Sequence, residues 1–213
     1  MAAMGARKRA LRPDEKEDRY RAILDAAESL LLRSPGRSAN MAEVAGEAGL
    51  AKGTVYLYFS SKEELLLALH ERSVDAVFRA LIAVLDRQPA LEADQILSLT
   101  RRRLVESPLF LPLAARCIAA MDRSVRAEVA TGFQLRMAQR LQRAGARLER
   151  RLRGLERGDG ARLLRQSFAL ILGLWQMASV TGASVSDDLD RALRSLWEGS
   201  LGRPKYNART SSP

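Results

Sequence analysis

Cysteine and histidine, which many disulfide, metal and catalytic sites require, are almost absent from this sequence. Among 213 residues there is one cysteine, Cys117, and one histidine, His70. A single cysteine excludes an intramolecular disulfide, and the chain is therefore expected to be cytoplasmic. The apolar neighbours of Cys117 indicate that it is a small residue of the core. His70 has no acidic or nucleophilic partner at a suitable spacing, and no zinc-ligand cluster, phosphate-binding glycine loop or serine elbow occurs. We therefore expect no catalytic residues, no metal and no cofactor, and hence no enzyme.

Residues that favour β-strands are also sparse. Aromatic residues make up 5% of the chain, whereas hydrophobic residues in total reach 47%, enough for an ordinary core. The 14 glycines and 7 prolines gather at a few break points and leave long stretches uninterrupted. These features predict an all-α protein.

The positive charge is unevenly distributed. The net charge is +10, but residues 1–65 hold 11 basic and 10 acidic side chains, so the excess lies in residues 66–213. Arginine outnumbers lysine by 30 to 5, a skew that codon usage in a GC-rich genome produces without a functional demand. Net charge alone is therefore weak evidence for nucleic-acid binding. We interpret residues 1–16 as a disordered basic arm, because no apolar segment follows to make a secretory signal, and residues 203–213 as a disordered tail.

Apolar residues recur at helical spacing along most of the chain. The pattern predicts a first helix over residues 17–33 and two short helices before Tyr58, and a capping box from Ser61 to Glu64 then opens a long helix toward Arg87. Further helices are predicted over residues 92–106, 109–119, 122–156, 161–181 and 187–201, separated by proline, glycine and polar breaks.

The two short helices have the pattern of a helix-turn-helix unit. Asn40 is a suitable N-cap, and Gly49 stands where the first short helix must end in a left-handed conformation. In the second helix Val55 and Phe59 share one face and suit a small core. The polar side chains that this core does not use are Lys52, Thr54, Tyr56 and Tyr58, and all four types can bond phosphate oxygens.

Residues 40–65, NMAEVAGEAGLAKGTVYLYFSSKEEL, resemble the signature of the TetR family of transcriptional repressors. The resemblance implies a three-helix DNA-binding domain over residues 17–65 and a helical ligand-binding and dimerisation domain over residues 66–202. It implies that the residues facing the major groove of an operator are Lys52, Gly53, Thr54 and Tyr56, with Gly53 allowing the backbone to approach the DNA. It also implies that three residues hold phosphates, namely Asn40, Tyr58 and Lys62. The sequence departs from the family pattern at Ala51, where a serine cap is common, and at Asn40, where threonine is usual.

The family pattern also implies a homodimer formed by the last two long helices, here within residues 161–201. No charged residue occurs from Gln166 to Ser186, as expected for a helix that packs in its own subunit on one face and on a partner on the other. Ala169 and Gly173 are four residues apart and would permit close helix approach.

Large, adaptable side chains on segments expected to converge predict a small-molecule effector site in the C-terminal domain. The apolar candidates are Phe110, Phe133, Met137, Phe168, Trp175 and Met177. Gln134 and Gln176 are the candidates for orienting a polar group, and ordinary core packing is the alternative for each residue singly. Because the domain is basic and acidic residues are scarce on these faces, a neutral or anionic apolar molecule fits better than a cation.

Two alternative functions remain open at this stage. A helical membrane-associated or partner-binding protein would use the apolar segment 166–186 and the Arg-rich segment 136–165. Interleaved polar residues argue against a membrane span, and leucines at helical spacing favour reading the arginines as the solvated face of a long helix. The second alternative keeps the fold but makes the protein an activator or a regulator that needs no ligand.

Overall fold

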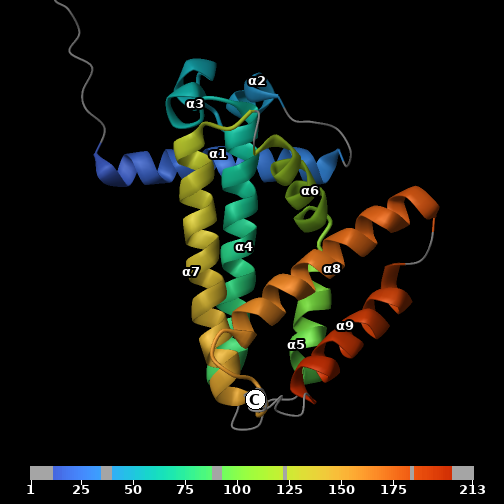
Figure 1. Cartoon of the computed structure of the whole chain (residues 1–213). Helices are drawn as coiled ribbons and strands as arrows, with labels where there is room; N and C mark the ends of the chain where they lie inside the picture. Colours follow the sequence, from blue (N-terminus) through green and yellow to red (C-terminus); the bar gives the residue numbers. More distant parts are fainter. Residues whose placement is uncertain (1–11, 35–39, 88–92, 122–123, 183–184, 203–213) are drawn as a thin grey trace, which may run out of the picture. The chain divides into compact units, whose positions relative to one another are not determined.

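The computed structural model describes residues 12–34, 40–87, 93–121, 124–182 and 185–202 (Figure 1). All regular secondary structure in these ranges is helical, which confirms the predicted all-α class. The chain divides into two compact units, residues 1–69 and 70–213. The division lies inside one continuous helix, a few residues beyond the boundary predicted after residue 65. The predicted tail at 203–213 and residues 1–11 of the predicted arm lie outside the described residues.

The first unit contains α1 (Pro13–Arg33), α2 (Met41–Glu47), α3 (Lys52–Tyr58) and the first turns of α4 (Lys62–Arg87). The predicted basic arm was therefore too long, because α1 begins at Pro13 and not at residue 17. Proline suits the first helical position, where its missing N–H costs nothing. The Glu15 carboxylate, in the first turn, accepts a hydrogen bond of 3.3 Å from the backbone N–H of Arg12.

A small apolar core holds the helices of the first unit together. Ile23 of α1, Val44 of α2 and Val55 of α3 have no exposed surface. The rings of Tyr20 and Phe59 lie 5.2 Å apart, which connects α1 with the end of α3. Val55 and Phe59 thus form the packing face that the sequence predicts.

The turn between α2 and α3 has the predicted left-handed glycine. Gly49 has a φ of +65°, a conformation that costs a residue with a β-carbon energy. The backbone N–H of Leu50 bonds the carbonyl of Ala45 at 2.9 Å, so this turn closes the end of α2. Outside the turn, Arg33 of α1 donates to Glu47 of α2 at 2.7 Å and fixes the two helices to each other.

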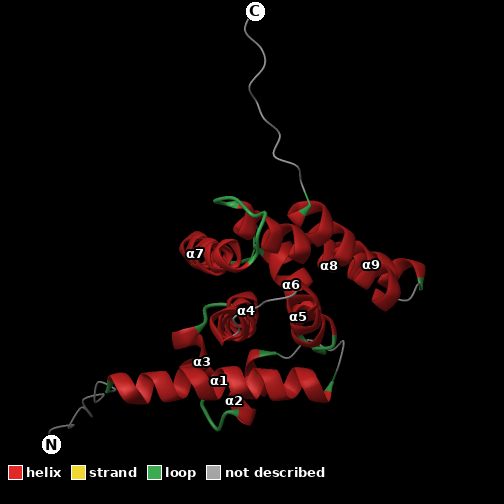
Figure 2. Cartoon of the chain, turned by 90° about the horizontal axis from the view of Figure 1, so that it is seen from below, coloured by secondary structure: helices red, strands yellow, loops and turns green. Residues whose placement is uncertain are grey.

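The second unit contains the rest of α4, α5 (Ala93–Thr100), a π-helical turn η1 (Arg101–Val105) and α6 (Phe110–Ala120). It continues with three further helices, α7 (Ala127–Arg151), α8 (Asp159–Thr181) and α9 (Val185–Leu201). Figure 2 shows α8 beside α9, in agreement with the contacts between them. Helix α7 ends before the predicted residue 156, because Gly154 and Gly158 adopt positive φ angles that a helix does not continue through.

Two clusters of buried side chains form the core of the second unit. One contains Val74 of α4, Phe110 of α6 and Ile171 of α8. The other contains Leu85 of α4 and Trp197 of α9, together with residues of α5, α7 and α8. Helices α4, α8 and α9 contribute buried residues to both clusters.

Helix α8 passes the length and composition test for a membrane span, but only 22% of its most apolar window is buried within the chain. One such helix is weak evidence for a membrane protein, since core helices of soluble proteins pass the same test. Its buried face, with Leu163 and Ile171, packs in the core clusters. Its exposed side carries polar residues such as Arg162 and Gln166 and, toward the end of the helix, the apolar Met177 and Val180.

Candidate functional site

The short helix α3 presents a polar face that its own core does not use. Lys52, Gly53 and Tyr56 are exposed, whereas Val55 is fully buried. The Lys52 ammonium lies 5.9 Å from the centre of the Tyr56 ring, within the range of a cation–π contact. The sequence-based division of this helix is therefore confirmed for Val55 and Phe59 on the packing side and for Lys52 and Tyr56 on the free side, whereas Thr54 and Tyr58 are partly buried.

The helix ends around α3 differ in how they are capped. Asn40 Oδ1 accepts from the N–H groups of Ala42 and Glu43, each at 2.9 Å, so this residue caps α2 as predicted. Ala51 gives α3 no side-chain cap, as expected from an alanine where a serine cap is common in the family. A missing N-cap costs a helix about 1 kcal/mol. Helix α3 therefore depends on the packing of Val55 and Phe59 for its stability.

The start of α4 carries the predicted capping interactions. The Ser61 hydroxyl accepts from the N–H of Glu64 at 3.1 Å, and the Glu64 carboxylate accepts from the N–H of Ser60 at 3.1 Å. Lys62 is the first residue of the helix and is partly exposed. Its position in the first turn of a helix is one where an anion is favoured.

Tyr58 is placed less favourably for the phosphate contact that the family resemblance implies. Its hydroxyl is buried and has no hydrogen-bond partner among the described residues. The ring would have to turn outward before this oxygen could meet a phosphate.

Sequence reasoning missed Leu57 on the same helix. This side chain is 82% exposed and follows Tyr56 directly. It belongs neither to the packing face of α3 nor to the polar residues predicted to contact DNA. An apolar side chain left out of the core of a short, otherwise polar helix face was the signal that could have identified it.

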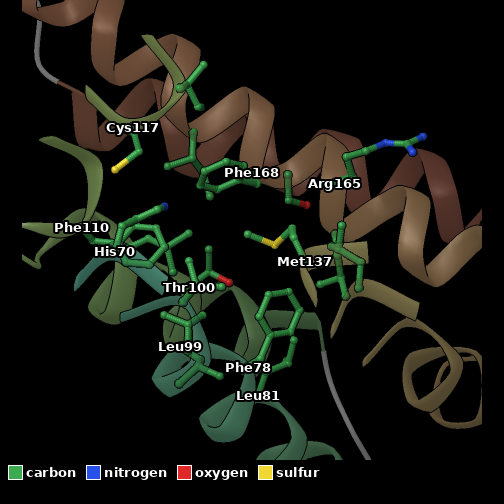
Figure 3. A pocket seen from close by; sticks show the side chains of 18 of the residues that line it. His70, Phe78, Leu81, Leu99, Thr100, Phe110, Cys117, Met137, Arg165 and Phe168 are labelled. Carbon is green, nitrogen blue, oxygen red and sulfur yellow. The ribbon is translucent and has the colours of Figure 1, made fainter. Parts of the chain in front are cut away.

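A cavity of about 300 Å³ lies inside the second unit (Figure 3). Four of the eight residues predicted for a ligand site line it, namely Phe110, Phe133, Met137 and Phe168. They come from α6, α7 and α8, so the expectation that these segments converge is correct for these positions. Side chains of α4 and α5 complete the walls.

The other four predicted ligand residues do not line this cavity. Gln134, Gln176 and Met177 are exposed, and Trp175 packs against the core cluster around Ile171. The reason is helix rotation, because each residue turns the side chain by about 100°. Gln134 is therefore exposed, with its amide 3.7 Å from the sulfur of Met121, although its neighbour Phe133 lines the cavity. Neither glutamine is placed to orient a ligand in this cavity.

Sequence reasoning also passed over His70, which lines the cavity from α4 with only 3% of its surface exposed. Its ring packs edge-on against Phe110 at 5.2 Å. Burial lowers the pKa of His70 to about 4, although the negative charge of Glu71 opposes this shift. The imidazole is therefore neutral near pH 7. A histidine in the apolar stretch LLLALH was the available signal.

Cys117 lines the cavity as well and is buried, as its apolar neighbours predicted. Burial raises the pKa of its thiol to about 12. The thiol therefore stays protonated and unreactive at neutral pH. No group of three or more histidine, cysteine, aspartate or glutamate side chains that could hold a metal occurs among the described residues.

The Arg-rich segment is not simply a solvated face. Arg136 donates to both oxygens of Glu71, at 2.6 and 2.8 Å. Arg140 bonds Glu71 at 3.0 Å and Asp75 at 3.1 Å. Burial raises the pKa of Glu71, but its hydrogen bonds with the two arginines outweigh this effect and leave the pKa lowered. Part of the basic charge of α7 thus serves to fix it beside α4.

Two family models match the chain over almost all of its described length. Residues 23–69 match the model described as bacterial regulatory proteins, tetR family. Residues 71–194 match the tetracyclin repressor-like C-terminal domain. The chain belongs to the TetR family. This membership confirms the predicted architecture and agrees with the expectation that the chain is not an enzyme.

Individual relatives within the TetR family match the chain over shorter segments than the family models do. The repressor KstR of Rhodococcus jostii is 30% identical over 119 residues, which cover 56% of each chain. The regulator EthR of Mycobacterium tuberculosis is 39% identical over 80 residues, 38% of this chain and 37% of EthR. The matches therefore span between about a third and just over half of these relatives. A TetR regulator structure from Rhodococcus sp. RHA1 shares the fold, with a TM-score of 0.61 and 23% identity over 85% of this chain and 97% of that one.

Proposed function

We propose that this TetR-family protein is a homodimeric transcriptional repressor that leaves its DNA operator when a small organic molecule occupies the cavity. The main support for the DNA-binding part of this proposal is the exposed polar face of α3. Lys52 and Tyr56 are exposed together on the second helix of a helix-turn-helix, which is the element that enters a major groove. Gly53 has open space beside it, so the backbone can approach a base edge closely.

The side chains of α3 suggest how the work of recognition is divided. Lys52 and Tyr56 have the hydrogen-bonding groups that reach base edges and phosphates. Leu57, with its exposed apolar side chain, suits contact with a thymine methyl group. Asn40 and Lys62 stand at helix starts, where phosphate oxygens are favoured.

Exposed apolar side chains in the second half of α8 support the proposed dimer. Met177 is 58% exposed and Val180 82% exposed, and both lie on the same side of the helix as Ala169. A β-carbon at Gly173 would meet no atom within 4 Å, so this position is open in the single chain. A second copy packed on this face would bury the apolar side chains and fix the spacing of two recognition helices near 34 Å, roughly one turn of DNA.

Repression is the sign of regulation that we propose, because the relative KstR, matched over the longest segment of those described above, is named a repressor. An activator with the same fold is the other candidate. A reporter gene placed behind the operator in a host cell decides between them. Expression that falls when the protein is supplied supports a repressor, and expression that rises supports an activator.

The DNA-binding proposal is tested by selecting fragments of the source genome on the purified protein. Enrichment of one or a few sequences with twofold symmetry supports it. A set of fragments no different from the starting pool at physiological salt would contradict it. Because affinity for DNA depends steeply on salt, the selection should be run at two salt concentrations.

A further inference from the structure

The cavity contains one buried polar side chain that has no partner. His70 Nδ1 is buried and makes no hydrogen bond to any described residue. Buried polar groups in native proteins are almost always hydrogen-bonded, and an exception calls for a reason. Here the side chain lines a cavity large enough for an organic molecule.

Besides His70, Thr100 brings a hydroxyl to the cavity wall (Figure 3), and the remaining polar groups are engaged, weak or remote. The Ser167 hydroxyl donates to the carbonyl of Leu163 at 2.8 Å and accepts from the Trp197 indole at 3.0 Å. The protonated thiol of Cys117 is a weak donor. Figure 3 shows the guanidinium of Arg165 pointing away from the space that His70, Phe110 and Phe168 surround.

The surroundings of His70 do not favour a charged ligand. None of the described residues that line the cavity is acidic, so no carboxylate can pair with a cation. The nearest acidic group along the chain, Glu71, is occupied by Arg136 and Arg140. The neutral imidazole offers one donor and one acceptor and no charge for an anion. A charged molecule would lose its hydration without compensation.

We propose that the cavity binds an uncharged, mainly apolar organic molecule with a single hydrogen-bonding group, such as a hydroxyl or carbonyl, and that His70 recognises this group. This inference rests on the proposed function, because such a molecule would be the effector that releases the protein from DNA. Its binding to the cavity can nevertheless be tested without DNA. Phe110, Phe133, Met137 and Phe168 would surround the apolar body of the molecule, while His70 fixes its orientation.

The test uses probes that share one body and differ in one group. Binding of naphthalene, 2-naphthol, 2-naphthoate and 2-naphthylmethylammonium to the full-length protein is measured by calorimetry or intrinsic fluorescence. 1-Octanol, octanoate and octylammonium repeat the comparison with a flexible body. In the wild type the uncharged alcohols should bind more tightly than both charged forms.

The variant His70→Leu identifies the residue responsible. Its preference for 2-naphthol over naphthalene should fall by about fivefold to tenfold, the value of one hydrogen bond, while naphthalene binding persists. Cys117→Ala, which also changes the cavity wall, should leave the preference unchanged. If His70→Leu does not fold, His70→Phe takes its place.

Three results would overturn the inference: tightest binding of a charged probe, an unchanged preference in the His70 variants, or no binding of any probe at its solubility limit. Its failure is distinguishable from that of the proposed function. If 2-naphthol binds through His70 but leaves DNA affinity unchanged, the ligand class stands and 2-naphthol does not act as an effector.

Discussion

The backbones of Gly145 on α7 and Gly160 on α8 lie in direct contact where the two helices cross. A β-carbon added to Gly160 would lie 2.8 Å from the Cα of Gly145, and one added to Gly145 would lie 2.8 Å from the carbonyl carbon of Gly160. Glu149 of α7 strengthens the junction, since its carboxylate accepts from the N–H groups of Gly158 and Gly160 at 2.9 and 3.0 Å. The crossing therefore admits only glycine at both positions.

Replacing Gly145 with alanine should destabilise the protein by about 1–3 kcal/mol or more, because backbone atoms cannot move aside as a flexible side chain can. Urea unfolding measures the change. The matched control is Gly46→Ala, where a β-carbon meets nothing within 4 Å. There the better helix propensity of alanine should stabilise by about 0.5–1 kcal/mol. Equal effects of the two changes would contradict the close crossing.

The low pKa of His70 predicts a dependence of stability on pH. In the folded protein the pKa is about 4, below the ordinary value of 6.5. Between these values the unfolded chain binds more protons, so the free energy of unfolding falls as pH drops from 6.5 to 4, by roughly 3 kcal/mol at most. Above pH 6.5 His70 contributes no dependence. The difference in stability between wild type and His70→Phe should change across this window, and parallel profiles would count against a buried neutral imidazole.

Gly173→Arg tests the proposed dimer face. Since the position is open in the single chain, an arginine there should leave the subunit folded but block close approach of a second copy. Light scattering after gel filtration should show a dimer for the wild type, and monomer or aggregate for the variant. Gly46→Arg, on an equally open glycine of α2, is the control and should stay dimeric. A monomeric wild type at micromolar concentration would refute the interface.

Lys62→Ala should weaken specific and non-specific DNA binding to a similar degree. A phosphate contact carries no sequence information, and its loss should reduce the slope of log affinity against log salt by about one unit. Titrations of operator and scrambled DNA at several salt concentrations provide both values. Loss of operator binding alone would instead place Lys62 at a base.

The helices could be predicted from the sequence because their signals are local. Apolar spacing located α1, α4 and α8, and Gly49 marked the turn before α3. The orientation of each helix about its axis was less accessible, since it depends on neighbours far away in the sequence. For this reason Phe133 lines the cavity whereas the adjacent Gln134, predicted beside it, does not. The burial of His70 and the glycine crossing of α7 and α8 likewise arise only when distant segments meet.

The central claim is that the free face of α3 reads DNA, and operator binding by Tyr56→Ala and Lys52→Ala tests it most directly. Both side chains are exposed and lie outside the packing face of Val55, so both variants should keep the wild-type melting temperature and oligomeric state. Affinity for the operator fragment selected from the genome should fall about tenfold or more in each. Unchanged operator affinity in both folded variants would contradict the assignment of this surface.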